Sequence, residues 1–285
     1  MYRRSRSTLT IIKELLRNAA GVFFWGENKL KLHFDIFGFI IPSYGLMIGL
    51  GVVLANVIAF GLIKKRKHDP NDFVVLEGYT FLGGFLGAKL LYILVSLKEI
   101  EWNRMLELDY FNQVMKGGFV FYGGLIGGLI IVFVAGKLHK IRAIEYVRTY
   151  IFLIPFIHSF GRVGCFLAGC CYGVPYDGKG AVCYPEGAFA PSGIPLFPVQ
   201  LVEAVLLLYI AGGLLFLQLK LNWNYTIETY LVAYSFVRFG LEFLRYDEAR
   251  GYFLNVSTSQ WISIGMIGTA ACFFIVEKRA AKKTK

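Results

Sequence analysis

Apolar residues occur along this chain in long runs, separated by shorter polar or basic stretches. A helix needs about 20 mostly apolar residues to cross a bilayer core, so each long run predicts one membrane span. The pattern predicts an all-α integral membrane protein with about seven transmembrane helices. The expected spans are about 39–63, 73–97, 118–136, 150–168, 198–219, 227–244 and 257–276.

Two further segments flank or interrupt these spans. Residues 8–25 form an amphipathic pattern whose apolar part is too short to cross, which predicts a helix at the membrane interface. If residues 9–27 did cross, the count would be eight and the N-terminus would lie inside. Residues 169–197 are rich in Gly and Pro and too polar to span, so we expect a long outer loop.

The domain organisation follows from these boundaries. We expect a basic, amphipathic segment at 1–36, one transmembrane domain at 37–277 and a basic cytoplasmic tail at 278–285. No small-residue cleavage site follows the first apolar stretch convincingly, so we expect no cleavable signal peptide.

Composition supports a membrane location. Of the 285 residues, 56% are hydrophobic and 17% are charged, and the mean hydropathy is +0.56. Soluble domains carry about a quarter charged residues. A soluble protein of this composition would expose much apolar surface to water, so soluble classes are set aside.

The net charge of +11 is concentrated beside the spans, as in residues 64–67. Such clusters fix topology and contact anionic lipid. The basic segments 64–67 and 137–148 and the C-terminal tail fall on one side of a seven-span protein, which is then cytoplasmic. The sequence contains no nucleic-acid-binding pattern, so we expect membrane lipid rather than nucleic acid as a partner.

Glycines mark two faces for close helix packing. Gly83, Gly84 and Gly87 fall on nearly one face of the second span, and residues 123–128 contain four more glycines in the third. Small residues at such spacing let two helix backbones approach closely in a membrane.

Charged side chains inside the spans are the candidate functional residues, because burying them in lipid is costly. They are Lys89, Arg162, and the pair Arg238 and Glu242, which are four residues apart and share a helix face. Buried guanidinium groups match phosphate oxygens, and a phospholipid headgroup supplies phosphate in a membrane. The alternative is a structural Arg238–Glu242 pair and an Arg162 that extends to the interface.

Several short motifs stand in order along the apolar part of the chain. The central one is Gly161-Arg162-Val163-Gly164-Cys165-Phe166, and the others occupy 43–47, 84–92, 117–125, 198–203, 238–245 and 259–263. Together they resemble the phosphatidylglycerol–prolipoprotein diacylglyceryl transferase family, whose central motif reads Gly-Arg-Ile-Gly-Asn-Phe. The resemblance covers about residues 35–277.

This resemblance implies an activity and its substrates. The family has seven transmembrane helices and an active site toward the outer face of the bacterial cytoplasmic membrane. It transfers diacylglyceryl from phosphatidylglycerol to the lipobox cysteine of a prolipoprotein, forming a thioether and releasing glycerol phosphate. No cofactor and no metal are implied.

The resemblance and the buried charges together indicate the site residues. We expect Arg162, Arg238, Glu242 and Tyr122 to be catalytic. In our hypothesis both arginines bind the phosphate, Glu242 orients Arg238, and Tyr122, in the place of the family's histidine, donates a hydrogen bond to the phosphate. The expected substrate-binding set is Arg162, Tyr44, Gly164, Cys165, Gly173, Gln200, Glu203 and Tyr234.

The chain departs from the family pattern at several polar positions, which indicates a divergent branch. Tyr122 replaces a histidine, Cys165 and Ala168 replace asparagines, Cys170 replaces a glutamate and Val202 replaces a tyrosine. These changes keep two other functions open: a paralogue that uses the phospholipid donor with a different acceptor, and a non-catalytic lipid-binding protein. The cysteines alone suggest a thiol-redox protein.

Four of the five cysteines lie close together in the sequence, at 165, 170, 171 and 183. Three interpretations stay open for them. They are buried inert thiols, or two of them form a disulfide that fastens the outer loop, or they bind a metal although paired Cys-x-x-Cys spacing is missing.

Overall fold

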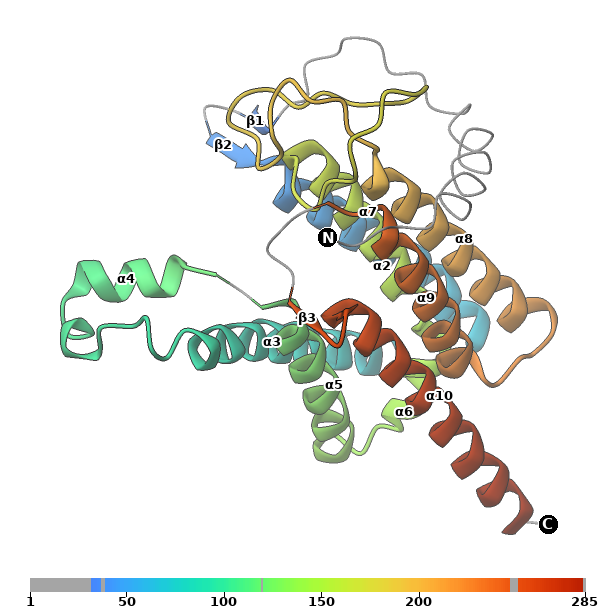
Figure 1. The fold of residues 1–285 in the computed structure, drawn as a ribbon. Helices are drawn as coiled ribbons and strands as arrows, with labels where there is room; N and C mark the ends of the chain where they lie inside the picture. Colours follow the sequence, from blue (N-terminus) through green and yellow to red (C-terminus); the bar gives the residue numbers. More distant parts are fainter. Residues whose placement is uncertain (1–31, 37–38, 119, 247–250, 284–285) are drawn as a thin grey trace. The chain divides into compact units, whose positions relative to one another are not determined.

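The computed structural model describes residues 32–36, 39–118, 120–246 and 251–283. The predicted interfacial helix at 8–25 lies outside these residues. Within them the protein is almost entirely helical, with two small two-stranded hairpins (Figure 1).

A helix forms within each of the seven predicted spans. These helices are α2 (Ser43–Arg66), α3 (Pro70–Val95), α5 (Phe121–Leu138), α7 (Leu153–Ala168), α8 (Val199–Lys220), α9 (Thr226–Leu241) and α10 (Thr258–Lys283).

Four of these helices, α2, α3, α8 and α10, are long and apolar enough to cross a membrane. A fifth span results if α6 (Ala143–Tyr150) and α7 form one broken crossing. The remaining two, α5 and α9, are shorter, with 18 and 16 residues. The protein is therefore an all-helical, multi-pass membrane protein with four to five candidate spans among the described residues, and the count of seven stays a prediction.

Several short elements were not predicted. Strands β1 (His33–Ile36) and β2 (Phe39–Pro42) pair antiparallel, with Ile36 opposite Phe39. The first span was expected to begin at Phe39, but residues 39–42 serve as a strand and the helix begins at Ser43. The others are η2 (Trp102–Arg104), α4 (Leu108–Lys116), α6, η3 (Glu242–Leu244), β3 (Tyr252–Phe253) and β4 (Val256–Ser257).

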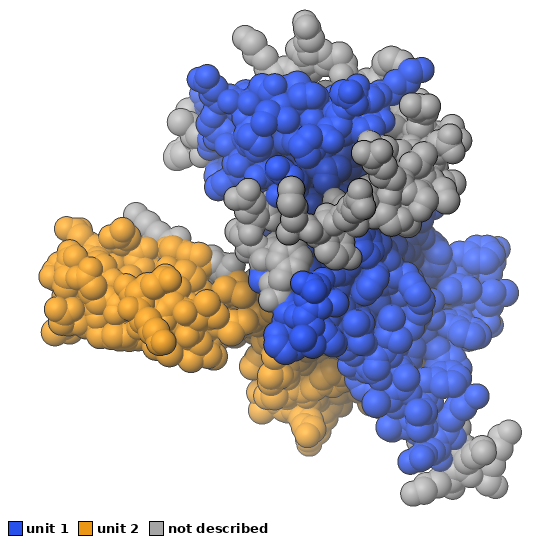
Figure 2. Space-filling model, viewed as in Figure 1, with its two compact units in different colours: residues 1–57, 150–285 blue, residues 58–149 orange. Residues whose placement is uncertain are grey.

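The chain divides into two compact units, shown in different colours in Figure 2. Unit 1 comprises residues 1–57 and 150–285, and unit 2 comprises residues 58–149. In unit 1, α8 packs against both α7 and α9, and α9 packs against α10. The prediction of one domain over 37–277 stays a prediction.

Unit 2 is built on the packing of α3 against α5, where two rows of glycine meet. A Cβ atom added to Gly83 would lie 2.6 Å from the carbonyl oxygen of Gly127. A Cβ on Gly127 would in turn lie 2.9 Å from the Cα of Gly87. Only glycine allows the two backbones this close, so the predicted tight helix contact is confirmed.

Lys89 is buried in unit 2 and holds the end of another helix there. Its Nζ donates to the carbonyl oxygen of Val114, at 2.6 Å, and of Gly117, at 3.1 Å. These carbonyls belong to the C-terminal end of α4, where helical carbonyls are left without intrahelical donors and attract cations. The intramembrane lysine therefore has a structural role in α3–α4 packing.

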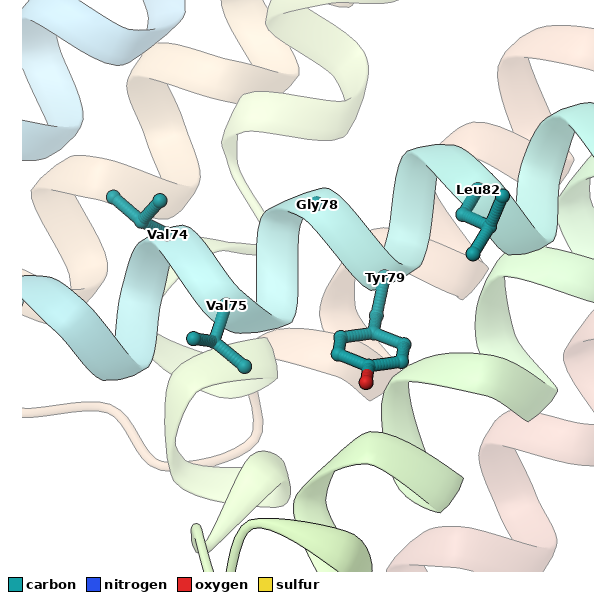
Figure 3. A pocket seen from close by; sticks show the side chains of 5 residues that line it. All are labelled: Val74, Val75, Gly78, Tyr79 and Leu82. Atoms are coloured by element: carbon teal, nitrogen blue, oxygen red, sulfur yellow. The ribbon is translucent and has the colours of Figure 1, made fainter.

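A shallow hollow also lies on α3 (Figure 3). Its lining consists of Val74, Val75, Gly78, Tyr79 and Leu82, all from this one helix and none of them charged. It contains no predicted site residue, and the hydroxyl of Tyr79 lies 3.2 Å from His139 Nε2.

Candidate active site

Arg162 and Glu203 form a buried ion pair between α7 and α8. Arg162 Nη2 lies 3.0 Å from Glu203 Oε1, and the side chains are 12% and 2% exposed. The sequence did not indicate that these two residues form a pair, because they lie on different helices, 41 positions apart. Since an unpaired charge buried in a membrane protein is costly, Glu203 is what allows Arg162 to remain inside.

Arg238 forms the second buried pair, as its spacing from Glu242 predicted. Arg238 Nη2 lies 2.8 Å from Glu242 Oε2, and the side chains are 9% and 4% exposed. The same nitrogen donates to Ser259 Oγ at 2.8 Å. Arg238, which belongs to α9, is thus held by Glu242 of η3 and by Ser259 in the first turn of α10.

The start of α10 is fixed by a reciprocal cap. The backbone N–H of Gln260 donates to Ser257 Oγ at 3.2 Å, and the backbone N–H of Ser257 donates to Gln260 Oε1 at 3.1 Å. This Ser-x-x-Gln arrangement is a capping box. Because Ser259 lies between the two capping residues, its hydroxyl is held in place for Arg238.

A histidine connects the two arginine-bearing helices. His158 lies four residues before Arg162 on α7, and its ring is 5.5 Å from that of Tyr234, centroid to centroid. Tyr234 in turn lies four residues before Arg238 on α9. His158 interacts electrostatically with both arginines, so all four side chains belong to one seam between α7 and α9.

Each arginine keeps a buried donor that no described residue accepts. These donors are Arg162 Nε and Arg238 Nη1, and both are shielded from solvent. A buried donor without an acceptor costs about 1–3 kcal/mol. A ligand oxygen placed beside each of these donors would remove that cost.

Gly164 lets α7 approach the start of α2. A Cβ at this position would lie 2.9 Å from Tyr44 Cα and 3.2 Å from Tyr44 O. Tyr44 is exposed on the second residue of α2. The glycine of the central motif therefore brings Tyr44 next to the turn of α7 that carries Arg162.

The loop at 169–197 folds back on the end of α7 and is held there by Gln200. Gln200 Nε2 donates to the carbonyl oxygen of Cys170 at 2.8 Å and to the hydroxyl of Tyr184 at 3.2 Å. Burial raises the pKa of Tyr184, so its hydroxyl stays protonated. Tyr184 packs with Phe166 and Leu196 in a small apolar core under the loop.

Gly173 is packed between two other segments of unit 1. A Cβ there would collide with the carbonyl oxygen of Phe197 and lie 3.0 Å from that of Leu244. Next to it, the N–H of Val174 donates to Leu244 O at 2.9 Å. Gly173, expected in the substrate-binding set, therefore packs against protein backbone beside the end of α9.

Three cysteines meet where α7 ends. Gly169 ends the helix in the left-handed conformation, with φ +74°, and the N–H of Cys170 donates back to Cys165 O at 3.1 Å. This glycine C-cap returns the chain to its own last turn. The Sγ atoms of Cys165, Cys170 and Cys171 consequently lie within 4.8 Å of one another.

The remaining cysteines lie outside this cluster. Cys183 and Cys272 are exposed, and all five cysteines are free thiols in the structure. Hydrogen bonds with Cys165 and Cys170, together with the nearby Arg245 and Arg162 guanidinium groups, lower the pKa of Cys171.

The predicted site residues divide between the two units. All of them except Tyr122 belong to unit 1, and they gather around the α7–α8–α9 seam and the beginning of α10. Tyr122 is the second residue of α5, in unit 2. Its proposed hydrogen bond to phosphate therefore stays a prediction.

Sequence reasoning missed His158. The available signal was its spacing: it lies four residues before Arg162, so the two share one face of α7. The residue attracted no attention because it stands outside the central motif, within the apolar stretch that precedes it.

Comparison with known proteins agrees with this arrangement. A protein from Clostridium perfringens (strain 13 / Type A), named phosphatidylglycerol–prolipoprotein diacylglyceryl transferase 2, is 32% identical over 250 residues, which cover 87% of this chain and 96% of that protein. The transferase of Clostridium tetani is 35% identical over 246 residues, covering 86% and 96%. That of Pasteurella multocida is 31% identical over 268 residues, covering 85% and 90%.

The family model described as prolipoprotein diacylglyceryl transferase matches residues 31–276, which include every predicted site residue. With most of its length matched by that model and by relatives more than 30% identical, this chain belongs to the prolipoprotein diacylglyceryl transferase family.

Proposed function

We propose that this protein transfers the diacylglyceryl group of phosphatidylglycerol to the lipobox cysteine of prolipoproteins. One structural observation carries the proposal: two buried arginines in one seam, each with a donor that no described residue accepts. The names of the relatives specify the same donor lipid and the same class of acceptor.

The phosphate of phosphatidylglycerol is assigned to Arg162 and Arg238. Guanidinium groups stay protonated and present several N–H groups in a plane, which suits the oxygens of a phosphodiester. Glu203 and Glu242 each pair with the Nη2 atom of one guanidinium group, and Arg162 Nε and Arg238 Nη1 are left without an acceptor among the described residues. Fixed positive groups in a site without water stabilise the negative charge of a leaving phosphate strongly.

The reaction is a substitution at carbon. The sulfur of the acceptor thiolate forms a bond to the carbon of the diacylglyceryl group that carries the phosphate ester. The carbon–oxygen bond to phosphate breaks, and its electron pair leaves with glycerol phosphate. The proton of the acceptor thiol must first pass to a base, because the thiolate is the nucleophile.

His158 is the side chain assigned to receive that proton. It lies in the seam beside Tyr234. The proton that it takes up must pass on at once, because burial and the two nearby arginines disfavour an imidazolium. An imidazole is the commonest general base in enzymes. Tyr122, which stands where the family pattern has histidine, keeps its assigned role as a hydrogen-bond donor to phosphate.

The other predicted binding residues shape the surroundings of the lipid. Tyr44, Gly164 and Tyr234 are assigned to the walls beside the arginines, since Gly164 contacts Tyr44 and Tyr234 adjoins His158. Gln200 and Gly173 hold the loop that follows α7, and Cys165 lies one turn after Arg162.

The membrane arrangement is proposed to have seven spans, with α5 and α9 as the two short ones. The basic segments 64–67, 137–148 and 278–285 then lie on the cytoplasmic side together with the C-terminus. The loop at 169–197 and the arginine seam lie toward the outer face, where a lipobox cysteine would be presented.

Complementation of a bacterial strain lacking its own transferase tests the proposal. The wild-type chain should restore lipidation of a reporter prolipoprotein, and Arg162→Ala should not, although it is present in the membrane. Arg104→Ala is the matched control, because Arg104 is an exposed arginine that pairs with Glu101 and Glu107. Failure of the wild type, with phosphatidylglycerol binding intact, would favour a different acceptor or a lipid-binding protein without catalysis.

A further inference from the structure

The cysteine cluster at the end of α7 has the composition and geometry of a metal site. We infer that Cys165, Cys170 and Cys171 bind one thiophilic cation of the Zn²⁺ or Cu⁺ class through three sulfur ligands. Of the three thiols, only Cys165 belongs to the expected substrate-binding set, and metal binding is measured separately from transfer.

The spacing of the sulfur atoms suits such an ion. The three Sγ atoms lie within 4.8 Å of one another. With a metal–sulfur bond of about 2.3 Å, sulfurs bound to one ion lie about 3.8–4.0 Å apart. A movement of less than about 1 Å, within the reach of side-chain rotation, closes the ligand set around the ion.

The backbone presents these thiols together in the folded chain. Cys165 belongs to the last full turn of α7, while Gly169 reverses the chain and Gln200 holds the carbonyl of Cys170 at 2.8 Å. Cys171 has a left-handed backbone, with φ +56°, a conformation that non-glycine residues rarely adopt. The ligands are therefore held before any ion arrives, which lowers the entropic cost of binding.

The charges around the cluster balance a metal–thiolate complex. Three thiolates with Zn²⁺ carry a net charge of −1, and with Cu⁺ they carry −2. Arg162 and Arg245 both interact electrostatically with Cys171. Their positive charges offset the negative charge of such a complex.

Softness of the ligands selects the class of ion. Thiolates select Zn²⁺ and Cu⁺ over the hard cations Mg²⁺ and Ca²⁺, which take oxygen ligands. Zn²⁺ would need a fourth ligand, such as water or an incoming thiol, whereas Cu⁺ is satisfied by three sulfurs. The ion would clip the start of the outer loop to the end of α7.

The test uses the full chain, purified in detergent with its thiols reduced and no oxygen present. Zn²⁺ and Cu⁺ are titrated separately against a competing chromophoric chelator, and bound metal is counted by mass spectrometry after desalting. We expect one ion per chain, with the thermal unfolding midpoint rising until one equivalent has been added. The preferred ion shows whether the site is four-coordinate or three-coordinate.

Single substitutions identify the ligands. Cys165→Ala, Cys170→Ala and Cys171→Ala should each weaken binding at least 100-fold, while Cys183→Ala and Cys272→Ala, outside the cluster, should bind as the wild type does. Cd²⁺ gives a second readout, since its thiolate absorption should fall with each ligand removed. Retention of less than 0.1 ion per chain by the folded wild type would overturn the inference. Equal weakening by Cys183→Ala, or an intact disulfide within the cluster after reduction, would overturn it too.

Discussion

Arg162 Nη2 and Glu203 Oε1 lie 3.0 Å apart between α7 and α8, and both side chains are largely buried. The central motif of the chain thus depends on a carboxylate 41 residues away for charge balance. A pair of this kind holds the guanidinium in place while leaving Arg162 Nε open for a ligand.

Glu203→Ala should destabilise the protein by about 3–5 kcal/mol, because it leaves a buried positive charge without a partner. Thermal unfolding in detergent measures the effect. In a double-mutant cycle with Arg162→Met, the two losses should not add, since each removes the same pair. Additive losses would mean that the two residues do not interact.

Ser259→Ala should lower kcat/KM about 3–10-fold, because it removes one of the two groups that hold Arg238 Nη2. Arg238→Ala should lower it at least 100-fold, since the phosphate itself loses a charged contact. Steady-state transfer to a lipobox peptide gives both values. An effect of Ser259→Ala as large as that of Arg238→Ala would contradict a positioning role for the serine.

His158→Gln should lower kcat at least 100-fold and change KM for phosphatidylglycerol little, because a glutamine fits the seam and cannot take a proton. Raising the pH of the assay ionises the acceptor thiol without the help of a base. The loss of kcat caused by His158→Gln should therefore become smaller as the pH rises. A variant that loses lipid affinity instead, with kcat unchanged, would assign His158 to binding and not to proton transfer.

Gly87→Ala should destabilise unit 2 by about 1–3 kcal/mol, because the new Cβ meets the backbone of α5 at Gly123 and, at 2.9 Å, at Gly127. Gly78→Ala on the same helix is the matched control. Its Cβ meets nothing within 4 Å, so the change should be neutral or stabilise by roughly 0.5–1 kcal/mol. Thermal unfolding in detergent compares the stability of the two variants. Equal effects would contradict the close packing of α3 against α5 at their glycines.

Much of this fold could be predicted from the sequence, because lipid imposes strong constraints. Runs of apolar residues gave each of the seven long helical segments, and the glycine rows of α3 and α5 gave their contact. The spacing of Arg238 and Glu242 gave their ion pair. In each case the signal is periodicity within one helix, or a composition that lipid tolerates.

The rest depends on which helices become neighbours. The partner of Arg162 is on another helix. The motif at 198–203 marked Glu203 as a binding residue, but nothing in the sequence paired it with Arg162. His158 lay in an apolar stretch where only its four-residue spacing from Arg162 carried information. The meeting of three cysteines follows from the reversal at Gly169, a turn that cysteine spacing alone does not reveal.

The most direct measurement of the central claim uses the purified chain with phosphatidylglycerol and a lipobox peptide, followed by mass spectrometry of the peptide. We expect a diacylglyceryl mass gain on the peptide cysteine with the wild type and with Arg104→Ala. We expect no gain with Arg162→Ala or with a peptide whose cysteine is replaced by serine. A full adduct with Arg162→Ala, or no adduct with the folded wild type, would contradict the assignment of the arginine seam to this reaction.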